Sequence, residues 1–144
     1  MLVNHEKKFK VWHKELKCWG KPCIGKDFNE LDYVIPLGAQ YVYFHNVYMD
    51  YAPTVFSSEK VDLLDEHVME YIEIIQFAGL KDVHNEEIYE KYIVKFKNSW
   101  NKEVISVVEF RDGCFKVFNG NVWDELYRYK VEIIGNIFEH SELL

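Results

Sequence analysis

The sequence predicts a mainly β fold, with minor α, in which the chain after about residue 70 forms a small barrel. Aromatic residues make up 17% of the chain, with ten tyrosines, ten phenylalanines and four tryptophans, and such side chains favour pleated, half-buried surfaces. Several short strand-like runs follow residue 70, and the tight turns between them are typical of small barrels. The clearest of these turns is Asp112-Gly113, a strong two-residue hairpin signal.

The hairpin centred on Asp112-Gly113 should be the best-defined local structure. Centring the strands on that turn pairs residues of like or complementary character: Phe110 with Phe115, Val108 with Val117, and Glu109 with Lys116. One face is then apolar and the other carries an opposite-charge pair, each pairing contributing about 0.2–1 kcal/mol. A shift of one residue would set Glu109 against Phe115 and mix the two faces.

The run from Ile74 to Phe96, IIQFAGLKDVHNEEIYEKYIVKF, reads as a strand, a tight turn, a short irregular link and a second strand. It resembles the signature of the YopX family, small proteins encoded by phages and prophages. That signature typically has a Gly-Leu-Lys-Asp run, an Asn-Gly-type turn and an Ile-Tyr-Glu run. The matching residues here are Gly79 to Asp82, His84 to Glu86, and Ile88 to Glu90, with further matches at Phe9 to Glu15 and Val131 to Leu144. Residues 16 to about 69 match only loosely.

The resemblance implies an SH3-like barrel in the C-terminal half and an elaborated β-rich N-terminal region. We therefore expect one domain over residues 1–144, with an N-terminal region of about 1–69 and a barrel region of about 70–144. The resemblance also implies a phage or prophage setting and the cytoplasm of a bacterial host. It implies no biochemical function, because none is established for the family.

Gly79, which matches the family pattern, supplies backbone freedom where the strand must turn. Two departures from the family pattern concern other turns. Asn85 stands where the family usually has glycine, and asparagine is the non-glycine residue best suited to a left-handed backbone. Lys91 and Tyr92 replace the family's usual Gly-Asp, so any role of that turn does not carry over to this chain.

Other elements are expected from local patterns. Lys8 to Leu16 is compatible with a helix through Phe9, Trp12, His13 and Leu16, but the resemblance favours a first strand. Glycine and proline predict a loop over Trp19 to Leu31. Caps at Ser57 or Ser58 predict a short helix to Val68, although the apolar spacing also allows one long helix through Ile75. A strand should begin near Glu70, and a final strand should run from Tyr129 to Ile134 and lead into Gly135-Asn136.

The segment from Tyr41 to Tyr51 is apolar on both alternating faces, within a strand-like region that begins at Tyr33 and is interrupted near Pro36. Such a strand is buried between layers or covered by another subunit. We expect a homo-oligomer, with an interface formed in part by Tyr41, Tyr43, Phe44, Tyr48 and Met49. The alternative is that the N-terminal region covers this strand within one chain.

No catalytic, cofactor or metal site is expected. His13, Cys18, Cys23 and Cys114 are ligand types that zinc accepts, but their spacing is not that of a zinc knuckle. The remaining histidines form no metal or catalytic motif, and no phosphate-binding loop or nucleophile elbow is present. Trp100 and Trp123 lie beside polar residues and are the candidates for an exposed aromatic surface, whereas core packing is the commoner use of tryptophan.

The charge distribution bears on the partners. The net charge is −7, but residues 1–26 hold seven lysines against two glutamates, and the remainder holds ten basic against twenty-two acidic residues. An acidic body argues against nucleic acid as a partner, and no run is long enough to span a membrane. Two functions follow as hypotheses: a non-enzymatic, self-associating binding or assembly protein, or a small acidic inhibitor or adaptor that occupies a basic site on a host or phage protein. The basic residues 1–26 would contact an acidic partner or the chain's own acidic body.

Overall fold

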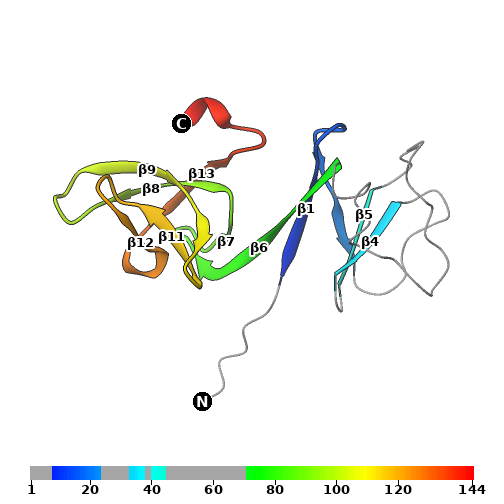
Figure 1. Ribbon diagram of the computed structural model, residues 1–144, viewed down its shortest axis with the longest axis horizontal. Helices are drawn as coiled ribbons and strands as arrows, with labels where there is room; N and C mark the ends of the chain where they lie inside the picture. Colours follow the sequence, from blue (N-terminus) through cyan, green and yellow to red (C-terminus); the bar gives the residue numbers. More distant parts are fainter. Residues whose placement is uncertain (1–7, 24–32, 38–39, 45–70) are drawn as a thin grey trace, which may run out of the picture. The chain divides into compact units, whose positions relative to one another are not determined.

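The computed structural model describes residues 8–23, 33–37, 40–44 and 71–144 (Figure 1). The chain divides into two compact units, an N-terminal unit over Lys8–Ile74 and a barrel unit over Ile75–Leu144. The described residues are mainly β, which confirms the predicted fold class. The prediction of one domain over the whole chain stays a prediction.

The N-terminal unit begins with two antiparallel strands, β1 (Phe9–His13) and β2 (Cys18–Trp19). Across this pair the rings of Trp12 and Trp19 meet edge to face at 5.0 Å between centroids. The strand interpretation of the segment from Lys8 is confirmed, and the helical alternative is wrong. Cross-strand aromatic pairing of this kind stabilises the ladder.

Three further strands form a second sheet in the N-terminal unit: β3 (Lys21–Cys23), β4 (Tyr33–Leu37) and β5 (Gln40–Phe44). Their order is β3-β5-β4 with antiparallel pairing throughout. The predicted loop over Trp19 to Leu31 is therefore wrong at its start. Pro22 misled the prediction because β3 is an edge strand, where proline's missing N–H does no harm.

The barrel unit is built from the later strands, listed here in chain order: β6 (Ile72–Lys81), β7 (Glu87–Tyr89), β8 (Tyr92–Lys97), β9 (Glu103–Val107), β10 (Glu109–Arg111), β11 (Cys114–Phe118), β12 (Trp123–Glu125) and β13 (Glu132–Asn136). Two short 3₁₀ turns, η1 (Leu126–Arg128) and η2 (Ser141–Leu143), complete it. Strand β6 starts in the N-terminal unit and continues into the barrel unit, and the part within the barrel unit pairs with β7. The predicted short helix ending at Val68 lies outside the described residues, but the long helix through Ile75 is wrong, because that residue belongs to β6.

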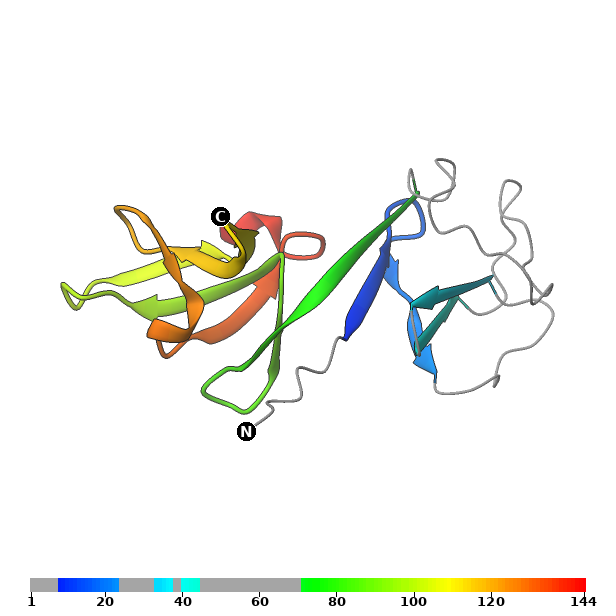
Figure 2. The ribbon, with the colours of Figure 1, turned by 60° about the horizontal axis from the view of Figure 1, so that its bottom comes forward.

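Two three-stranded sheets, β13-β8-β9 and β10-β11-β12, curl into a half-barrel (Figure 2). The chain passes from one sheet to the other at Val108, which is the only residue between β9 and β10. There the Val108 N–H donates to the Tyr92 carbonyl at 2.8 Å, and the Lys91 N–H donates to the Val108 carbonyl at 2.7 Å. The Ser106 hydroxyl joins the sheets again by accepting a hydrogen bond from the Phe118 N–H at 2.8 Å.

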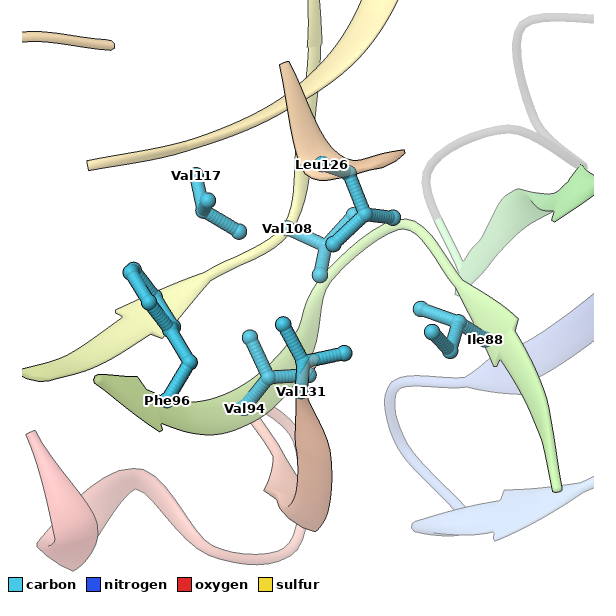
Figure 3. Close-up of a cluster of buried hydrophobic side chains, with 7 residues drawn as sticks. All are labelled: Ile88, Val94, Phe96, Val108, Val117, Leu126 and Val131. Carbon is cyan, nitrogen blue, oxygen red and sulfur yellow. The ribbon is translucent and has the colours of Figure 1, made fainter. Parts of the chain in front are cut away.

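Seven buried side chains form the core between the two curled sheets, and Figure 3 shows how they converge. They are Ile88, Val94, Phe96, Val108, Val117, Leu126 and Val131. Burial of a side chain of this kind contributes about 1.5–3 kcal/mol. Val108, at the corner where β9 turns into β10, belongs to this core.

The predicted hairpin register is confirmed. Glu109 lies opposite Lys116 and Phe110 lies opposite Phe115. Val108 and Val117 are fully buried, but Phe110 is 53% exposed, because the tip of the hairpin extends past the core. The ion pairs differ from the cross-strand pairing, since Glu109 binds Arg111 at 2.8 Å and Lys116 lies 3.5 Å from Asp112.

The final strand differs from its prediction in position. It was expected at Tyr129 to Ile134, whereas β13 spans Glu132–Asn136 and has a bulge between Ile133 and Gly135. The preceding residues form η1, whose Leu126 enters the core. Pairing with β8, which is distant in sequence, decides where this strand lies.

Candidate functional site

The loop between β6 and β7 is organised by the carboxylate of Asp82. Its Oδ1 accepts hydrogen bonds from the N–H groups of His84 and Glu86, both at 2.9 Å, and its Oδ2 accepts one from the Ile133 N–H at 3.0 Å. Burial alone would raise the pKa of Asp82, but these backbone donors, with His84 nearby, lower the pKa below its ordinary value. Asp82 therefore fixes its own loop and the start of β13.

The neighbouring residues of the Gly-Leu-Lys-Asp run are also used within the fold. Gly79 has a φ of +79° and lies in the irregular stretch of β6 between Phe77 and Lys81, where glycine avoids the strain of a side chain. Leu80 packs against the core, and Asn85 takes a φ of +66°, as its turn position predicts. The most recognisable motif of the sequence is thus structural.

Lys91 occupies a backbone conformation that favours glycine, with a φ of +68°. The turn is fixed on both sides, since the Lys91 N–H donates to the Val108 carbonyl and its own carbonyl accepts from the Ile137 N–H at 3.0 Å. The family's usual glycine at this position would meet the same requirement without strain. The backbone shape of the turn is therefore kept in this chain by a strained lysine.

Replacing Lys91 with glycine should raise the free energy of unfolding by about 0.5–1 kcal/mol, because relief of the left-handed strain exceeds the added entropy of the unfolded chain. Denaturant unfolding would measure the change. Lys91→Ala is the matched control and should give no such gain, because alanine keeps the Cβ. A loss of stability in Lys91→Gly would show that the lysine side chain, not its backbone, matters at this turn.

The outward side of the β10-β11-β12 sheet forms a second feature. Alternation along the strands sends Phe115 and Val117 inward to the core and sends the intervening residues outward. We call this surface the outer face. Its residues are Glu109, Arg111, Cys114, Lys116, Phe118, Trp123 and Glu125.

The centre of the outer face is a stack of arginine on tryptophan. The Arg111 guanidinium carbon lies 4.2 Å from the centre of the Trp123 ring, and the Phe118 ring meets the same indole edge to face at 5.7 Å. The Arg111 Nε donates to Glu109 at 2.8 Å, which fixes the guanidinium over the ring. Phe118 remains 40% exposed. Such a stack presents a flat apolar surface with charged donors at its rim.

The predicted exposed tryptophans have different surroundings. Trp100 is 61% exposed in the loop between β8 and β9, where its backbone N–H donates to Asn98 Oδ1 at 3.0 Å. Asn98 Nδ2 also donates to the Asn119 carbonyl at 3.0 Å, so this loop is tied to the one between β11 and β12. Trp123 is partly buried beneath Arg111. The two tryptophans thus lie in neighbouring parts of the barrel unit.

The predicted interface segment is described only in part. The backbones of Tyr41, Tyr43 and Phe44 lie in β5, the middle strand of its sheet, with partners on both edges. Tyr48 and Met49 lie outside the described residues. Because both edges of β5 are occupied, an interface here would have to use a face of the sheet.

Among the described residues, no group of three histidine, cysteine or acidic side chains is placed to hold a metal ion. His13 is buried and accepts a hydrogen bond at Nδ1 from the Leu16 N–H at 3.0 Å. Burial lowers the pKa of His13 and Glu15 partly opposes this effect. Cys18 and Cys114 are free thiols, and burial raises the pKa of Cys18. Of Cys23 only the backbone, at the end of β3, is described.

Two important residues were not singled out from the sequence. The signal for Asp82 was present, since an aspartate after a strand and before an asparagine is typical of a side chain that caps a turn. Arg111 gave no such signal, because its contact with Trp123 depends on the pairing of β11 with β12.

No helix among the described residues is long and apolar enough to cross a membrane.

Comparison with known proteins places these features in a family. Residues 38–144 match the family model described as YopX protein. Two similar crystal structures are protein EF1440 from Enterococcus faecalis, at 20% identity and a TM-score of 0.49 with 100% of this chain and 99% of that chain covered, and protein yopX from Bacillus subtilis, at 21% identity and a TM-score of 0.45 with 94% and 96% covered. No curated protein matches the chain.

Proposed function

The chain belongs to the YopX family, and we propose that it is a phage- or prophage-derived, non-enzymatic protein that binds other proteins and assembles with copies of itself. The proposed location is the cytoplasm of the bacterial host. The observation that supports a binding role best is the outer face, with its stacked Arg111 and Trp123 and its exposed Phe118. Tryptophan and arginine are the residues that most often dominate the energy of protein interfaces.

The surroundings of the outer face favour a protein partner over a small molecule. It is the outward side of a sheet, and Trp100 and Val122 add further exposed apolar area in the adjoining loops. Small ligands usually occupy concave sites that surround them, whereas exposed aromatic patches on a sheet are typical of protein contacts. Self-association is the simplest use, in line with the two-faced apolar segment at Tyr41 to Met49.

Light scattering on the purified full chain at micromolar concentration tests the assembly role. We expect a mass above the 17.3 kDa of one chain, because a second copy would cover apolar surface that a monomer leaves exposed to solvent. A single species at the monomer mass would contradict self-association. Co-purification from the natural host, performed in parallel, would identify any other partner.

A second candidate function is a small acidic inhibitor or adaptor that binds a basic site on a host protein. The net charge of −7 favours it, because charge complementarity accelerates encounter with a basic surface. Capture of one host protein by the purified chain at low salt, lost at high salt, would support this function. A stable homo-oligomer whose mass does not change with salt, and which captures nothing, would favour assembly instead.

A further inference from the structure

We propose that the outer face is the surface through which two copies of this chain pair, each copy using the same face. This rests on the proposed function, because it names the surface responsible for self-association. It differs from the sequence prediction, which placed the interface at Tyr41 to Met49.

The first argument is charge. Among the residues that define the outer face, two cations, Arg111 and Lys116, are balanced by two anions, Glu109 and Glu125. The face is therefore neutral, although the chain as a whole carries −7. Two copies that meet elsewhere on the acidic body repel each other, whereas two neutral faces do not.

The second argument is self-complementarity. In a two-fold pair the same patch meets itself, so each patch must hold both members of every contact. The outer face holds aromatic rings that can stack on their symmetry mates, and it holds cations and carboxylates on both sides of them. The opposite-charge groups of one copy can therefore meet those of the other.

The third argument is unused hydrogen-bonding capacity. Arg111 uses its Nε for Glu109, while its two terminal amino groups donate to no acceptor among the residues that the structure describes. A planar guanidinium with two parallel donors suits a carboxylate. Glu125 on β12, held by Arg128 at 2.9 Å through Oε2, is such an acceptor on the second copy.

The test compares two exposed phenylalanines of one hairpin. Phe118→Glu places a charge at the centre of the outer face and should weaken self-association by about tenfold or more. Phe110→Glu is the matched control, since Phe110 is 53% exposed on the opposite side of the hairpin, and should leave the mass unchanged. Sedimentation velocity across a range of protein concentrations measures the association, and circular dichroism checks the fold.

Arg111→Glu provides a second variant that does not alter the aromatic rings, and it should also weaken the pair. Loss of association in Phe118→Glu and Arg111→Glu, but not in Phe110→Glu, would support the proposal. Unchanged association in both outer-face variants would overturn it. If Tyr43→Glu then dissociates the oligomer, self-association stands and only the surface is wrong. A wild-type chain that remains monomeric would overturn this proposal together with the assembly role.

Discussion

Replacing Asp82 with alanine should lower the free energy of unfolding by about 3 kcal/mol, because three backbone N–H groups lose a charged acceptor at once. Two of them belong to the loop after β6 and the third is that of Ile133 at β13. Glu103→Ala, at an exposed acidic residue of β9, is the control and should change stability by no more than about 0.5 kcal/mol. Denaturant unfolding of the two variants makes the comparison, and equal effects would contradict the role given to Asp82.

The same carboxylate predicts a dependence on pH. The pKa of Asp82 is lowered in the folded protein, so its contribution to stability is complete above the ordinary aspartate pKa and is lost as pH falls through the lowered value. Asp82→Asn keeps one acceptor oxygen but cannot ionise, and it turns an amide group towards the Ile133 N–H. The variant should therefore lose less stability than wild type between pH 7 and about pH 3. Parallel acid profiles would contradict this expectation.

Replacing Gly135 with alanine should destabilise the protein by about 2 kcal/mol, through overpacking at the β13 bulge. A Cβ at Gly135 would lie 2.8 Å from both Cβ and Cγ of His140. The histidine cannot move freely, because its Nδ1 accepts from the Asn136 N–H at 3.2 Å and its own N–H donates to the Asn136 carbonyl at 2.9 Å. The change in denaturation midpoint would measure the cost.

Double-mutant cycles separate this clash from other effects of the glycine. In a His140→Ala background the cost should fall only in part, since alanine keeps the Cβ that Gly135→Ala would meet. In a His140→Gly background the clash is removed, so the cost should nearly disappear. An unchanged cost in both backgrounds would mean that the backbone of the bulge, and not His140, excludes alanine.

The parts of the fold that were predictable are those set by neighbours in sequence. Turn chemistry at Asp112-Gly113 and strand alternation agree about one register, and Asn85 takes the left-handed conformation that its position suggests. The strands whose positions were predicted wrongly depend on partners that are distant in sequence. Strand β3 is held by β5, and β13 is positioned by β8 and by Asp82, 51 residues before Ile133.

In the candidate site, too, the predictable features are those set by neighbours in sequence. Exposed tryptophans can be suspected from polar neighbours in the sequence, and Trp100 is indeed exposed. The outer face as a unit could not be predicted, because the contact of Arg111 with Trp123 requires β10 and β12 to flank β11. Local patterns identify residue types, whereas sheet order decides which of them meet.

The loop after β11 has a consequence for the chemical ageing of the protein. Asn119-Gly120 is the kind of sequence in which the glycine nitrogen attacks the asparagine side chain and releases ammonia. Here the Asn119 Oδ1 accepts from the N–H groups of Asn121 and Val122 at 3.0 and 2.9 Å, and its Nδ2 donates to Tyr129 at 3.3 Å. The side chain is therefore withheld from that reaction until the loop opens. Deamidation at Asn119 becomes a record of how often this loop has opened in storage.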